Sequence, residues 1–123
     1  MTTILLIDDD PTVQAVFSQF LTGQGYTVIQ AENGKIGMRL LEEQKPDLII
    51  TDILMPEMDG LEILLSIKNT HADVPVIAIS GGMRNVPLNF LNQAKMFGAR
   101  YVFHKPVPLD VLNNAVKLIL EEG

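Results

Sequence analysis

Cysteine is absent from the 123-residue chain. Its absence excludes disulfides, thiolate metal ligands and a cysteine nucleophile, so any chemistry must use oxygen, nitrogen or a bound ion. Basic residues are also few. Fifteen acidic residues outnumber nine basic ones and give a net charge of −6, the wrong sign for a protein that holds phosphate backbones through lysine and arginine. We therefore expect no direct contact with nucleic acid.

Long hydrophobic runs are missing as well. No apolar stretch approaches the roughly 20 residues that cross a bilayer, and the N-terminus lacks the basic start of a signal peptide. We expect a cytoplasmic protein without membrane insertion. The length and the 47% hydrophobic content suffice for one core. Residues 1–123 are thus expected to form a single domain, and no output domain is expected after the last predicted helix.

Five short apolar runs alternate with longer segments of helical period. The first, third and fourth runs are almost continuously apolar, which is typical of parallel strands covered by helices on both faces. The pattern predicts an α/β, doubly wound (βα)5 fold with five parallel strands, and we expect the flavodoxin-like order 2-1-3-4-5, in which the first and third strands are neighbours. The predicted strands are Ile4–Ile7, Tyr26–Ile29, Leu48–Ile50, Val74–Ile79 and Tyr101–Phe103.

Polar side chains follow four of these five runs. In a doubly wound sheet ligands bind at the carboxyl ends of the strands, so these residues are expected to line one pocket. Two carboxylates about 4 Å apart repel by roughly 4 kcal/mol at an effective dielectric near 20, which favours a divalent cation bound by oxygen. Mg²⁺ fits best and indicates a phosphoryl-transfer site. The candidate residues are Asp8, Asp9, Asp52, Ser80 and Lys105.

Several polar residues at these strand ends also have an ordinary interpretation. Asp10 before Pro11 is expected to cap a helix and do nothing else. Asp8 and Asp9 taken alone are compatible with solvated turn residues, and Lys105 with a surface charge. What favours a site is their coincidence at one edge of the sheet.

Four segments carry a resemblance to a known family that extends over the whole chain. Ile4–Pro11 resembles an acidic pair, Asp52–Gly60 a phosphorylation motif, Val76–Ser80 a switch strand, and Lys105-Pro106 an invariant lysine with its following proline. These are the motifs of response-regulator receiver domains in two-component signalling, the CheY-like superfamily. The resemblance implies a signalling switch rather than a metabolic enzyme, with intrinsic autophosphorylation and autodephosphorylation.

The resemblance also implies roles at the acceptor. Asp52 would be the nucleophile that takes a phosphoryl group from a histidine kinase or a histidine phosphotransfer protein. Asp9 would bind Mg²⁺ directly and Asp8 would bind it through water. Asp52 and the backbone carbonyl of Leu54 would complete the protein ligands.

Further positions are implied to transmit the signal. Lys105 would pair with the phosphoryl oxygens after a cis peptide bond to Pro106, and the Ser80 hydroxyl would move toward the new phosphoryl group. That movement would change the partner-binding face of the fourth helix, fifth strand and fifth helix. The chain departs from the family at Val102, where the family's aromatic switch residue is expected. It also carries a longer segment, Gly81–Pro87, next to the switch.

Two alternatives remain open from the sequence. Asp8-Asp-Asp-Pro-Thr12 fits the Asp-x-Asp-x-Thr signature of haloacid-dehalogenase-type phosphatases, in which Asp8 would be the nucleophile. The chain has no room for the cap of such an enzyme. The second alternative is a receiver that docks a partner without phosphorylation, for which we would expect Asp52, the acidic pair or Lys105 to be lost.

Overall fold

The computed structural model describes residues 2–52, 60–80, 95–96 and 98–122. Five parallel strands form one sheet in the order β2-β1-β3-β4-β5, as predicted. Of the helix expected between the fourth and fifth strands, only Lys95 and Met96 lie within the described residues, and both are helical. The strands are β1 (Thr3–Ile7), β2 (Thr27–Ala31), β3 (Leu48–Asp52), β4 (Val76–Ser80) and β5 (Tyr101–His104), and the helices are α1 (Pro11–Gly23), α2 (Gly34–Gln44), α3 (Gly60–Thr70) and α5 (Leu109–Glu122).

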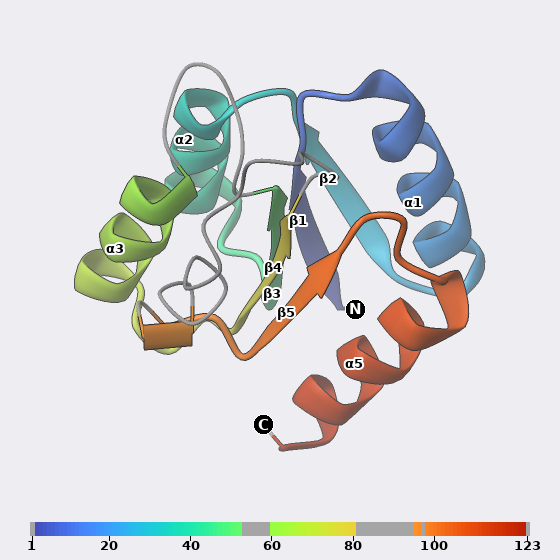
Figure 1. The fold of residues 1–123 in the computed structure, drawn as a ribbon. Helices are drawn as coiled ribbons and strands as arrows, with labels where there is room; N and C mark the ends of the chain where they lie inside the picture. Colours follow the sequence, from blue (N-terminus) through green and yellow to red (C-terminus); the bar gives the residue numbers. More distant parts are fainter. Residues whose placement is uncertain (1, 53–59, 81–94, 97, 123) are drawn as a thin grey trace.

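The sheet is covered by helices on both faces. Figure 1 shows α1 and α5 on one side of the sheet and α2 and α3 on the other. Because successive side chains of a strand point to opposite faces, Ile4 and Leu6 pack with α1 and α5, whereas Leu5 and Ile7 pack with α2 and α3. This explains why the first run is apolar without alternation. Within the described part of the chain, no helix combines the length and hydrophobicity needed to cross a membrane.

The bounds of all five strands differ from the predicted ones by one or two residues, and the second and fourth strands differ at both ends. The fourth strand begins at Val76 rather than Val74, because the Val74 amide donates a hydrogen bond to His71 O in the turn after α3. The second strand is shifted toward its C-terminal end and includes Gln30, which pairs with Leu6 of β1. Because Gln30 is polar, the pattern of apolar residues does not include it, and the predicted strand ends too early.

Caps at the N-termini of α1 and α2 fix the turns beside the carboxyl ends of the strands. The Asp10 side chain accepts hydrogen bonds from Thr12 N at 2.8 Å and Val13 N at 3.4 Å, so its predicted capping role is confirmed. Asn33 accepts one from Ile36 N at 2.8 Å. The chain therefore leaves β1 and β2 in defined turns.

Gly37 lets α2 approach β1 closely. A Cβ atom at this position would lie 2.5 Å from Ile7 Cδ1, a separation that packed side chains do not adopt. Glycine in a helix ordinarily costs roughly 1 kcal/mol relative to alanine, so the close approach is the physical reason for its presence here. Ile7 directly precedes Asp8, and this contact therefore helps to place the acidic turn.

Candidate functional site

Three carboxylates meet at the carboxyl end of the sheet. Asp8 and Asp9 follow β1, Asp52 ends β3, and these two strands are neighbours. One carboxylate oxygen from each residue lies within 4.8 Å of the others. Asp8 and Asp52 are buried, whereas Asp9 is exposed. The structure thus brings together the residues that strand-end reasoning expected to converge.

The ammonium group of Lys105 lies between two of these carboxylates. Its Nζ atom is 2.9 Å from Asp8 Oδ2 and 3.0 Å from Asp52 Oδ2. Lys105 follows β5, and the peptide bond to Pro106 is cis, as the resemblance implied. Five-stranded topology places β5 at the edge of the sheet, two strands from β3. The long lysine side chain therefore spans that gap.

Burial and charge pairing oppose each other at this group of residues. Burial raises the pKa of Asp8, and the hydrogen bond from Asp10 N and the contact with Lys105 only partly offset it. Burial alone would lower the pKa of Lys105, but hydrogen bonds and charge attraction to Asp8 and Asp52 outweigh it and raise the pKa above its ordinary value. Lys105 therefore remains charged, and its charge stabilises two carboxylates that would otherwise repel.

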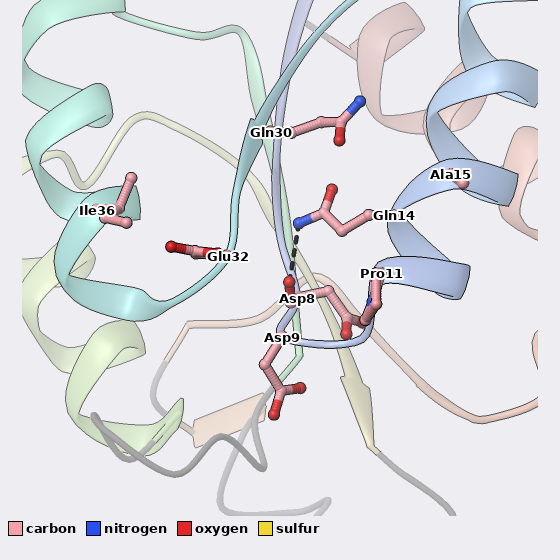
Figure 2. A pocket seen from close by; sticks show the side chains of 8 residues that line it. All are labelled: Asp8, Asp9, Pro11, Gln14, Ala15, Gln30, Glu32 and Ile36. Atoms are coloured by element: carbon pink, nitrogen blue, oxygen red, sulfur yellow. Dashed lines mark hydrogen bonds between the residues drawn. The ribbon is translucent and has the colours of Figure 1, made fainter.

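Gln14 is a structural member of the site that sequence reasoning missed. Its Nε2 atom donates to the backbone oxygens of Asp8 at 2.9 Å, Ala31 at 2.7 Å and Leu6 at 3.3 Å. Figure 2 shows the first of these bonds, which joins α1 to the acidic turn. The available signal was a polar residue between Val13 and Phe17 on the inward face of a predicted helix. A buried amide in such a position indicates backbone groups that need a donor.

Two other predicted residues and one segment are described only in part or not at all. Ser80 ends β4 opposite His104 of β5, and its side chain lies outside the described part of the structure. Leu54 and the segment Gly81–Pro87 lie outside the described residues altogether. The roles that the resemblance implies for the Leu54 carbonyl as a metal ligand and for the Ser80 hydroxyl as a switch stay predictions.

The side chains of β5 divide between the two faces of the sheet. Val102 packs with the cluster under α2 and α3, whereas Tyr101 and Phe103 pack on the face of α1 and α5. The two rings stack with centroids 6.2 Å apart and planes 3° from parallel. The aromatic side chains of this strand are thus directed away from the face where Val102 lies.

Comparison with known proteins agrees with this geometry. A family model described as the response regulator receiver domain matches residues 4–117. This chain belongs to that family. Sporulation initiation phosphotransferase F of Bacillus subtilis is 31% identical over 117 residues, which cover 95% of this chain and 92% of that protein. A CheY-like receiver domain protein from Methanospirillum hungatei superposes with a TM-score of 0.92 at 27% identity, over 99% of this chain and 95% of the other.

Other relatives of this receiver domain are longer proteins. The transcriptional regulatory proteins GlrR of Escherichia coli and AfsQ1 of Streptomyces coelicolor are each 34% identical to it, and this chain covers 26% and 53% of their lengths. The likeness therefore concerns their receiver domains. The family match over residues 4–117 also sets aside the phosphatase alternative, because it accounts for the acidic turn as part of a receiver domain and Asp10 acts as a helix cap.

Phosphoryl transfer to an aspartate is the established role of this family, and receiver domains in general depend on Mg²⁺. The donor set fits this ion, since carboxylate oxygens are the ligands that Mg²⁺ prefers, and three of them lie within 4.8 Å of one another. The exposure of Asp9 would leave room for the water ligands that Mg²⁺ usually keeps. The cluster is therefore one that could hold the metal.

Proposed function

We propose that this chain is a cytoplasmic phospho-accepting switch in which Asp52 receives a phosphoryl group from a histidine kinase or a histidine phosphotransfer protein. The observation that supports Asp52 most directly is the 3.0 Å contact between its Oδ2 atom and Lys105 Nζ, inside a group of carboxylates suited to Mg²⁺. A buried carboxylate beside a cation at the carboxyl end of a parallel sheet is well placed for this chemistry.

The chemical step is a displacement at phosphorus. An Asp52 carboxylate oxygen attacks the phosphorus atom, the new O–P bond forms, and the P–N bond to the donor imidazole breaks with its electron pair left on nitrogen. The Lys105 ammonium supplies positive charge beside the reacting carboxylate, at 3.0 Å in the unphosphorylated state. Mg²⁺ bound at Asp8, Asp9 and Asp52, with the Leu54 carbonyl as a further ligand, would neutralise charge on the transferred group.

Signal output would depend on Ser80 and on the surface formed by the fourth helix, β5 and α5. The Ser80 hydroxyl, at the end of β4, would bond the phosphoryl group and alter that surface for a downstream protein. Val102 has no ring, so this chain would not couple Ser80 to an aromatic rotation at that position. We propose protein partners and no direct nucleic-acid contact.

The acceptor is tested by chemical labelling. Purified protein is incubated with Mg²⁺ and acetyl phosphate, trapped with borohydride, and the modified residue is located by mass spectrometry. We expect label on Asp52 and none in Asp52→Asn, which removes the nucleophile and leaves a neutral amide of the same shape. Asp73→Asn, at an exposed carboxylate away from the site, should label like wild type.

Other outcomes have definite meanings. Label on Asp8 would contradict the assignment of Asp52 and restore the phosphatase-like alternative. No label with acetyl phosphate, phosphoramidate or a phosphorylated histidine kinase would favour a receiver that only docks its partner.

A further inference from the structure

Gln14, near the start of α1, buries an amide beside the acidic turn. The residue is 7% exposed, and its Nε2 atom donates to three backbone oxygens, those of Ala31, Asp8 and Leu6. Its Oε1 atom is buried and has no hydrogen-bond partner among the described residues. Because an unpaired buried acceptor is unfavourable, a side chain needed only for packing would be apolar here. The bonds of the amide nitrogen therefore explain why a glutamine stands at this position.

These bonds complete a hydrogen-bonded ring through the acidic turn. The Asp8 Oδ1 atom accepts from Asp10 N at 2.8 Å. The backbone oxygen of Asp10 accepts from Gln14 N at 3.0 Å, where α1 begins. Gln14 Nε2 then returns to the backbone oxygen of Asp8 at 2.9 Å. The ring therefore joins Asp8, Asp10 and Gln14, and Asp9 lies in the chain between the first two.

The end of β2 holds the same ring from a second element. The backbone oxygen of Ala31 accepts from Gln14 Nε2 at 2.7 Å and from Asp8 N at 3.1 Å. The N–H group of Asp8 is thus bonded to β2, and its C=O group is bonded to the Gln14 side chain of α1. Both backbone groups of Asp8 are fixed, so the direction in which the chain leaves β1 is fixed as well.

The placement of Asp9 depends on this backbone. Asp9 is exposed, so packing does not hold its side chain, yet its carboxylate lies within 4.8 Å of those of Asp8 and Asp52. Figure 2 shows the Asp9 carboxylate on the side of the turn away from Gln14. Its direction must therefore follow from the backbone on either side of it, which the hydrogen-bonded ring holds.

We infer that Gln14 is a positioning residue for the Mg²⁺ site, acting through the backbone of the acidic turn. The inference rests on the proposed function, because that function assigns the ion to these carboxylates. Groups that orient metal ligands from outside the ligand shell typically change metal affinity by roughly 10–100-fold when they are removed. Gln14 reaches the ligands only through their backbone, so we expect an effect of about tenfold.

The first test compares Mg²⁺ binding by wild type and Gln14→Met, followed by amide NMR. Methionine is close to glutamine in length and offers no N–H donor. We expect the dissociation constant for Mg²⁺ to rise by about tenfold. At saturating Mg²⁺ the rate of Asp52 labelling by acetyl phosphate should stay close to that of wild type, because the nucleophile and Lys105 are unchanged.

A second measurement needs no metal. Without Mg²⁺, the backbone amides of Asp8 and Asp10 should exchange their hydrogens faster in Gln14→Met than in wild type, because both amides donate within the bonded turn. Gln14→Asn keeps an amide but is shorter by one methylene, so it should show the same changes with less loss of packing. Exchange as slow as in wild type in both variants would contradict the positioning role.

Phe17→Leu is the matched control for stability. Phe17 is buried on the same helix and packs in the core away from the acidic turn, so this variant should lower Tm and leave the dissociation constant for Mg²⁺ unchanged. If Gln14→Met binds Mg²⁺ as wild type does, or if Phe17→Leu weakens binding equally, Gln14 has no positioning role and the proposed function stands. Absence of Mg²⁺ binding in wild type would instead overturn the metal site itself, and this inference with it.

Discussion

Replacing Lys105 by methionine removes the cation that joins Asp8 and Asp52 and keeps a side chain of similar length. In the wild-type structure Nζ lies 2.9 Å from Asp8 Oδ2 and 3.0 Å from Asp52 Oδ2. Without it, two buried carboxylates face each other with no compensating charge. We expect the folded state to lose stability and the site to gain affinity for a divalent cation.

The magnitude follows from these distances. At about 3 Å and an effective dielectric near 20, each contact is worth roughly 5 kcal/mol before desolvation. Desolvation of the ammonium offsets much of that, and breaking a fully buried pair costs roughly 3–5 kcal/mol. The Lys105 side chain is 18% exposed, so we expect a smaller net loss of about 2–3 kcal/mol. For 123 residues this lowers Tm by roughly 8–12 °C.

The assay is calorimetry at neutral pH, with and without millimolar Mg²⁺. Lys117→Met, at an exposed lysine on α5, serves as the matched control and should melt like wild type. Mg²⁺ should raise the Tm of Lys105→Met by more than it raises that of wild type, because the ion then replaces the lost charge. Lys105 is not the shared counter-charge if Lys105→Met has the same Tm as the control, or if Mg²⁺ raises the Tm of Lys105→Met and of wild type equally.

Three further outcomes follow from the same geometry. Gly37→Ala should cost roughly 1–3 kcal/mol in urea unfolding despite its better helix propensity, whereas Gly23→Ala, with nothing within 4 Å of the added Cβ, should not destabilise. Burial raises the pKa of Asp8 in the folded state above its unfolded value of 3.8. The protonated carboxyl therefore stabilises the folded state fully below pH 3.8, and this contribution is lost as pH rises through the higher folded pKa. The free energy of unfolding of Asp8→Asn, measured with urea, should therefore increase relative to that of wild type as pH rises above 3.8. Asp9→Ala should lose the Mg²⁺-dependent rise in Tm, and a rise equal to that of wild type would exclude Asp9 as a ligand.

The central strands were the easiest part of the fold to predict. β1 and β3 are buried along almost their whole length, so their residues form apolar runs without alternation. The edge strand β2 was harder, because Gln30 belongs to it through backbone pairing with Leu6 and not through hydrophobicity. The start of β4 depended on a turn hydrogen bond from Val74, which an apolar pattern does not reveal.

Some parts of the site could likewise be predicted from the sequence and others could not. Convergence of Asp8, Asp9 and Asp52 could be predicted, because the carboxyl ends of neighbouring parallel strands lie at one edge. The contacts of Lys105 with the two buried carboxylates, and the three backbone bonds of Gln14, were not foreseen. Both depend on groups that are brought together from different elements.

The identity of the reactive groups in this receiver domain, and their places at the strand ends, follow from local sequence. Apolar runs and the polar residues that end them are local properties, so they place carboxylates after β1 and β3 and a lysine after β5 without reference to the rest of the chain. How these groups act on one another depends on the folded arrangement of the strands. The separation of Lys105 from Asp52 along the chain is 53 residues, and their 3.0 Å contact exists because strand order fixes the distance and packing removes water around the buried carboxylates.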